Sequence, residues 1–80
     1  MVVRKRRGYG RAIVRAVKEL AFEELRAHRL WLDVKEHNAR ARALYRSEGF
    51  AEEGLLRECL RGPVRFESLI IMALLHHESR

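Results

Sequence analysis

A run of uncharged apolar residues at positions 69–75 constrains the fold of this chain more than any other feature. The run is too short to span a membrane as a helix, which takes about 20 residues, and its composition suits a strand in the middle of a sheet. Positions 61–63, Arg-Gly-Pro, are a strong turn signal, and positions 50–60 before them form another extended segment. We therefore expect a C-terminal β-hairpin with strands at 50–60 and 64–75, the second of which is central in a sheet.

Residues 11–28 carry the pattern of an amphipathic helix, because apolar side chains recur at steps of three and four while most charged ones fall elsewhere on the wheel. The apolar face predicted in this way consists of Ile13, Ala16, Val17, Leu20, Ala21 and Leu25. Residues 30–34 are too few for a helix and are flanked by charge, so they are predicted to form a short, largely buried strand.

A second helix is predicted from Asn38 to Glu48. Asn38 is a favourable N-cap residue, the alanines after it favour helix, and Gly49 stands where a left-handed C-terminal cap is expected. Ala41 and Tyr45 share one face of this helix. The order helix, strand, helix, hairpin predicts a single α/β domain over residues 1–80, with a sheet that is short on one side.

A chain of 80 residues has limited means of stabilising itself. A chain this short buries about 60% of the surface that its unfolded form exposes. One cysteine, Cys59, excludes an internal disulfide and is expected to be a small buried residue. The four histidines lack the ligand spacing of a structural zinc site, so no metal is expected. We expect association with another chain to supply the missing stability.

The net charge of +6 is concentrated near the N-terminus. Residues 1–20 hold seven basic side chains and one acidic one, whereas the remainder holds ten of each. Basic residues such as Arg11 and Arg15 interrupt the segment where a signal peptide would be apolar, and no apolar run is long enough for a membrane helix. We therefore expect a cytoplasmic protein, without membrane contact, that binds an anion near its first helix.

Residues 5–10, with the sequence KRRGYG, precede the first helix and suit a diphosphate. A helix start leaves backbone N–H groups unpaired and carries partial positive charge. The two glycines remove side chains that would block close approach, while Arg6, Arg7 and Arg11 add full charges. The alternative is an ordinary turn before a helix with a solvated basic face, since short glycine motifs also match by chance.

Asn38 and Tyr45 lie seven positions apart, which is two helical turns, so both project from the same face. Ala41 between them is small and leaves room for a ligand. Taken singly, Asn38 is also explained as a simple helix cap and Tyr45 as a core aromatic residue. Together with the glycine segment, their spacing favours a cofactor site.

These segments resemble the GNAT acyltransferase superfamily over nearly the whole chain. Residues 5–12 look like its glycine-containing loop, and residues 30–34 resemble the strand that follows. Six residues match the spacing of its second cofactor-contact segment: Asn38, Ala41, Leu44, Tyr45, Gly49 and Phe50. Residues 52–58 are similar to the branch of ribosomal-protein and polyamine N-acetyltransferases. The resemblance implies a partial GNAT fold, the C-terminal half, whose sheet is completed by another chain.

The resemblance also implies acetyl-CoA as the cofactor and an amine as the acceptor. The residues implied to bind the cofactor are Lys5, Arg6, Arg7, Gly8, Tyr9, Gly10, Arg11, Asn38 and Tyr45. Backbone N–H groups between residues 6 and 11 would contact the pyrophosphate, and Asn38 the pantetheine arm. Tyr45 would be the catalytic residue, because a phenol of pKa about 10 can protonate a leaving thiolate of about 8.5 where geometry or desolvation helps.

Three functions compete on this basis. The first is an acyltransferase half-domain that forms a homodimer or pairs with a separate N-terminal half, because unpaired sheet edges and bare apolar faces promote association. The second is a catalytically inactive remnant that binds CoA or only keeps the fold. The third is a nucleic-acid binder. Two features speak against it, because Tyr9 is the only aromatic residue among the basic ones and no recognisable recognition helix follows.

Overall fold

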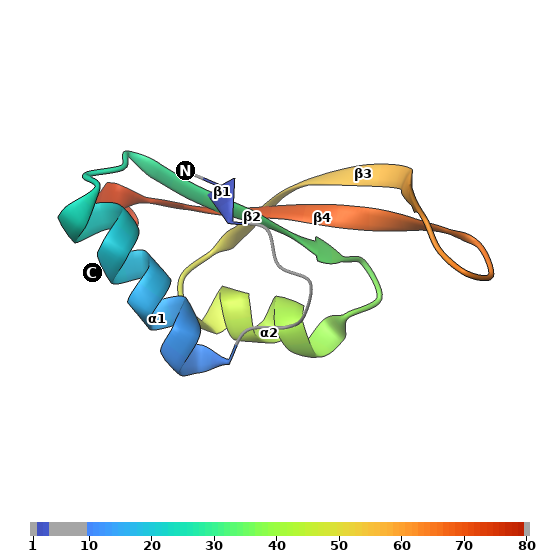
Figure 1. Ribbon diagram of the computed structural model, residues 1–80, viewed down its shortest axis with the longest axis horizontal. Helices are drawn as coiled ribbons and strands as arrows, with labels where there is room; N and C mark the ends of the chain where they lie inside the picture. The colour runs from blue at the N-terminus through green and yellow to red at the C-terminus, as the bar shows by residue number, and fades with distance from the viewer. Residues whose placement is uncertain (1, 4–9, 80) are drawn as a thin grey trace.

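A sheet with two helices on one face makes up the described part of the chain, which is residues 2–3 and 10–79 of a computed structural model (Figure 1). The predicted order of helix, strand, helix and hairpin is confirmed. The elements along the chain are β1 (Val2–Val3), α1 (Arg11–Glu19), the π-helical turn η1 (Leu20–Glu24), β2 (Arg29–Lys35), α2 (Ala39–Ser47), β3 (Ala51–Arg61), β4 (Phe66–Leu75) and the 3-10 turn η2 (His76–Glu78).

The strands lie in the order β1-β2-β4-β3, so β4 is central, as its apolar composition predicts. β1 is parallel to β2, and the other two pairs are antiparallel. The β3–β4 hairpin projects beyond β2 and both helices (Figure 1). β4 begins two residues later than expected, because Val64 is 92% exposed and belongs to the connection.

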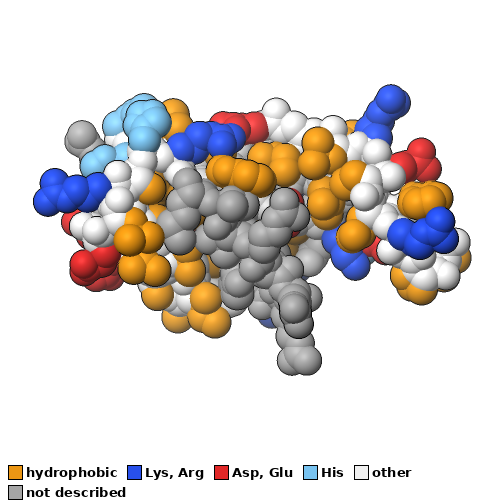
Figure 2. Space-filling model, turned by 45° about the horizontal axis from the view of Figure 1, so that its top comes forward, with side chains coloured by type: hydrophobic (Ala, Val, Ile, Leu, Met, Phe, Trp, Pro, Cys, Tyr) orange, Lys and Arg blue, Asp and Glu red, His pale blue; other side chains and the backbone are white. Residues whose placement is uncertain are grey.

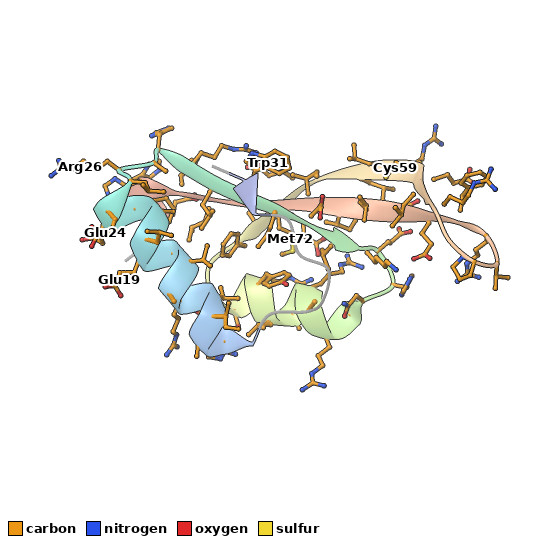
Figure 3. All side chains as sticks on the ribbon, in the orientation of Figure 1. Glu19, Glu24, Arg26, Trp31, Cys59 and Met72 are labelled. Atoms are coloured by element: carbon orange, nitrogen blue, oxygen red, sulfur yellow. The ribbon has the colours of Figure 1, made fainter. Side chains whose placement is uncertain are left out.

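The core lies between the sheet and the helices. Strand residues alternate, so Trp31 and Met72 point to opposite sides of the sheet (Figure 3). The side chains toward the helices are buried, and they are Leu30, Leu32, Val34, Ile70, Met72 and Leu74. The two helices and the segment after α2 cover them with Val14, Ala21, Phe22, Ala41, Tyr45 and Phe50.

The predicted apolar face of the first helix is wrong in part. Ile13, Leu20 and Leu25 are 50%, 45% and 60% exposed, whereas Val14 is buried. The helix has two adjacent apolar stripes, and the one that starts at Val14 packs on the sheet. The helix also ends at Glu24 rather than at residue 28, because it widens into the π turn and the chain then leaves helical geometry.

Both ends of α2 are as predicted. The Asn38 side chain accepts a hydrogen bond from the Ala41 N–H at 3.1 Å, and Gly49 has a φ of 99°, in the left-handed region. By contrast, Cys59 is exposed, because every residue of β3 is exposed. At the end of the chain, the His76 ring stacks on Phe22 with centroids 5.5 Å apart.

Candidate functional site

An open groove of about 800 Å³ lies between the start of α1 and the length of α2. It brings together the end of the glycine segment and the second helix, which are nearly 30 positions apart in the sequence. The described residues that line it are Gly10, Arg11, Asn38, Arg40, Ala41, Ala43, Leu44 and Ser47. Lys5, Arg6, Arg7, Gly8 and Tyr9, which are also predicted to bind the cofactor, lie outside the described residues.

The start of α1 is open to a ligand. Gly10 is the N-cap, and the first helical hydrogen bond runs from the Val14 N–H to the Gly10 carbonyl at 3.1 Å. The three N–H groups between them have no acceptor within an α-helix. A Cβ on Gly10 would meet no atom within 4 Å, and its φ of −75° is accessible to any residue. The missing side chain therefore leaves free space beside N–H groups that have no acceptor within the helix.

Asn38 and Ala41 line the groove, but Tyr45 does not reach its surface. Tyr45 is 0% exposed, and its ring packs against Phe50 with centroids 6.2 Å apart at an interplanar angle of 60°. Ala41 and Leu44, on the turn before it, form part of the groove wall. The catalytic role of Tyr45 stays a prediction, and the geometry shows a phenol held inside the core.

Three basic residues of α1 converge on one carboxylate, Glu48, directly after α2. The Arg11 guanidinium pairs with Glu48, and the Arg15 Nε lies 3.2 Å from its Oε1. The Lys18 Nζ donates to the Glu48 carbonyl at 2.8 Å and lies 3.5 Å from Oε1. The side chain of Glu48 is only 5% exposed. Part of the positive charge predicted to face a ligand is therefore neutralised within the protein.

The pKa of Glu48 reflects these contacts. Burial is the largest single influence and favours the protonated form, but hydrogen bonds from Arg15 and Arg11, together with the nearby charges, outweigh it. The pKa is lowered overall, so Glu48 is an anion at neutral pH. The sequence pattern predicts Glu48 only as the end of the second helix. The available signal was the spacing of Arg11, Arg15 and Lys18, which places three cations on one helix face.

Two further properties concern the described residues alone. Within residues 2–3 and 10–79, no group of three or more His, Cys, Asp or Glu side chains has the arrangement of a metal site. In that same part of the chain, no helix is long and apolar enough to cross a membrane.

The likeness to solved structures is extensive. Mutant forms of the spermidine/spermine N-acetyltransferase SpeG from Vibrio cholerae match with 29% identity and a TM-score of 0.84, over 90% of this chain and 43% of that one. The dodecameric spermidine N-acetyltransferase from the same organism matches with 29% identity and a TM-score of 0.81, over 90% and 42%. A GNAT-family acetyltransferase from Bacillus anthracis, 21% identical with a TM-score of 0.77 over 89% and 43%, shares the fold.

This chain thus spans less than half the length of each of these proteins. The expected partial GNAT fold is confirmed by the same matches. The sequence model of the acetyltransferase (GNAT) family matches residues 4–50, which include the glycine segment, β2 and α2. The match covers more than half of the residues of this chain, so the chain belongs to the GNAT family of acetyltransferases.

Proposed function

We propose that this chain is the acetyl-CoA-binding half of an N-acetyltransferase that transfers an acetyl group to an amine. The observation that carries the proposal is the groove in which the open start of α1 faces Asn38 and Ala41 of the second helix. Structural neighbours named as spermidine N-acetyltransferases support a polyamine as the class of acceptor.

The groove suits CoA in two places. The unpaired N–H groups at the start of α1 would bind the pyrophosphate, with Lys5 to Tyr9 contributing the rest of that contact. Because Glu48 holds the Arg11 side chain, the backbone of Arg11 is the better candidate for this role than its guanidinium. Asn38 would bind the pantetheine amides with the polar atoms that its capping bond leaves available.

Tyr45 is proposed as the general acid. Transfer of the acetyl group to an amine leaves a CoA thiolate, which takes up a proton. This role requires the phenol, which is 0% exposed and does not line the groove, to come within reach of the thiolate when the ligand binds.

The binding test uses two glycines at which an added Cβ would meet no atom within 4 Å. Calorimetric titration of the 80-residue chain with CoA and acetyl-CoA should give saturable binding. Gly10→Ala should fold normally, because its Cβ meets no atom within 4 Å, yet weaken binding by obstructing the close approach of the ligand. Gly54→Ala, on β3, has equal free space away from the groove and should bind like the wild type. Absence of binding to the wild type, or equal behaviour of both variants, would contradict the proposed site.

The catalytic test is Tyr45→Phe. Phenylalanine keeps the ring packing on Phe50 and removes the hydroxyl, so we expect turnover with spermidine to fall while CoA affinity stays nearly unchanged. Equal loss of turnover and affinity would refute the assignment of Tyr45 as the acid.

A non-catalytic CoA-binding module is the second candidate, and the full burial of Tyr45 favours it. Under this alternative, the wild-type chain binds CoA but transfers no acetyl group to spermidine or to peptide amines. The same titration followed by a screen of amine acceptors distinguishes the two candidates.

We further propose that a second copy completes the structure as a homodimer. The hairpin exposes apolar side chains on both of its faces, because Leu55 and Leu56 are consecutive in a strand. We call the exposed set the hairpin patch, and it consists of Leu55, Leu56, Leu60, Val64 and Phe66. Figure 2 shows hydrophobic side chains gathered over this end of the molecule. Edge strands and apolar patches of this kind promote association. A neighbouring GNAT structure is described as a dodecamer, which supports self-association.

Light scattering at micromolar concentration tests the dimer. Leu56→Glu should shift the chain toward a monomer, whereas Leu25→Glu, at a more exposed position outside the hairpin patch, should not. A cooperatively folded wild-type monomer at that concentration would refute the proposal.

A further inference from the structure

Glu48 is the link between the two elements that border the groove. It follows the last residue of α2, and it takes up the side chains of Arg11 and Arg15, which lie on the first two turns of α1. Lys18 adds a hydrogen bond to the backbone carbonyl of the same residue at 2.8 Å. One buried carboxylate therefore joins the end of α2 to the beginning of α1.

Among the described residues, few apolar side chains hold the beginning of α1. Val14 is the only fully buried residue between Arg11 and Glu19, and Val17 is partly buried against the core. The buried side chains Ala21 and Phe22 lie in the π turn, at the other end of the helix. Within the described part of the chain, the first turns of α1 are thus held by Val14, by Val17 and by the contacts with Glu48.

Stability alone is a weak explanation for this arrangement. Arg11 and Arg15 are 46% and 66% exposed, and ion pairs of exposed cations contribute little. Burying a carboxylate carries a desolvation cost that apolar packing would avoid. The ion pairs instead fix the position of the start of α1 relative to the end of α2.

We propose that Glu48 is a positioning residue that holds the start of α1 against α2, so that one ligand can contact both sides of the groove at once. The inference rests on the proposed CoA site. A ligand that contacts both Gly10, at the start of α1, and Asn38, at the start of α2, binds well only when the two helices are correctly placed. A fragment that contacts one helix does not depend on that placement.

The test compares a whole ligand with its parts. Glu48→Gln keeps the side-chain volume and removes the charge that attracts the three cations. CoA affinity should fall about tenfold or more, within the usual range of coupling between two sites. ADP and pantetheine each occupy one part of the groove, so no coupling is lost for them. The affinity for pantetheine should stay within about twofold, and the affinity for ADP should not fall, because Arg11 and Arg15 are released from Glu48.

Two control variants sharpen the comparison. Glu48→Asp keeps the charge and should recover part of the CoA affinity. Glu52→Gln removes another carboxylate that pairs with two arginines, Arg42 and Arg46, but this one joins α2 to β3 and should leave CoA affinity unchanged. If Glu48→Gln does not fold, Arg15→Gln removes one contact from a mostly exposed side chain and should show the same selective loss at smaller size.

A second measurement requires no ligand. Amide hydrogen exchange at residues 14–17 should accelerate in Glu48→Gln, while exchange in the π turn and in β4 should not. Unchanged exchange at the start of α1 would overturn the inference whatever the chain binds. Equal weakening of CoA, ADP and pantetheine would also overturn it, whereas a wild-type chain that does not bind CoA would refute the proposed function instead.

Discussion

The two strands of the hairpin pair with each other but lie in opposite environments. In β4, Met72 and Leu74 are 0% exposed under the helices, while all eleven residues of β3 are exposed. β4 lies between two strands and under two helices, whereas β3 is an edge with few helix contacts. The difference shows that this chain builds one well-packed layer and leaves β3 exposed, and β3 is the strand at which we propose that a second copy binds.

Leucine truncation on the two strands should give the largest difference. Leu74→Ala should lower the free energy of unfolding by about 2–5 kcal/mol, because it opens a cavity in the core. Leu56→Ala, at a side chain 47% exposed, should change it by about 0.5 kcal/mol or less when measured in urea at low protein concentration. If the alanine variant of Leu74 unfolds, Leu74→Val gives the smaller core loss. Equal losses at the two positions would mean that the hairpin is already buried in an assembly.

Glycine replacement gives the next effect. Gly49→Ala places a side chain at a φ of 99°, with its Cβ 3.4 Å from the Leu74 side chain, and should cost about 1–3 kcal/mol of unfolding free energy. Gly54→Ala in β3 should stabilise the chain by about 0.4–1 kcal/mol, because it meets no atom and restricts the unfolded state. A loss at Gly54 as large as that at Gly49 would show that β3 is closely covered.

Asn38 should give a loss of about 1 kcal/mol on replacement by alanine, because the cap of α2 disappears. Asn38→Asp keeps an oxygen that accepts from the Ala41 N–H and should retain most of the stability. Thermal unfolding measures the cap, and CoA titration of the aspartate variant measures the proposed ligand contact. An aspartate variant that is stable and binds CoA fully would exclude a need for the Asn38 amide.

Acid should weaken the connection between β3 and α2. Hydrogen bonds from Arg42 and Arg46 lower the pKa of Glu52 from 4.5 to about 2. Because the folded state then binds fewer protons than the unfolded state, the stabilisation is present above pH 4.5 and is lost as the pH falls toward 2. The free energy of unfolding of Glu52→Gln should therefore fall less steeply with acid than that of the wild type, and high salt should reduce the difference. Parallel curves for the two proteins would contradict this pairing in solution.

Local signals in the sequence predicted local structure well. Asn38 and Gly49 define the ends of α2 through contacts within a few residues, and the apolar run of β4 required a central position. The choice between the Ile13 and Val14 stripes depends on which side of a helix meets the sheet, and both stripes are apolar. Cys59 is exposed because β3 is an edge, which its own sequence does not reveal.

The sequence predicted the two segments that border the candidate site, but not the ion pairs that join them. The proximity of Gly10 to Asn38 and Ala41 follows from the two segments that resemble GNAT sequences. The ion pairs of Glu48 join residues 33 and 37 positions apart, and no local pattern specifies such a pair. The depth of Tyr45 depends on packing around the whole helix.

The exposed position of Cys59 on β3 provides a built-in chemical reporter. It is the chain's only thiol, so a maleimide labels one atom, which lies on the exposed strand β3. The rate of alkylation can be measured at several protein concentrations. A slower rate at high concentration would show that another chain covers the hairpin, and the measurement needs no substitution. The same thiol offers an attachment point for a fluorophore or spin label remote from the groove.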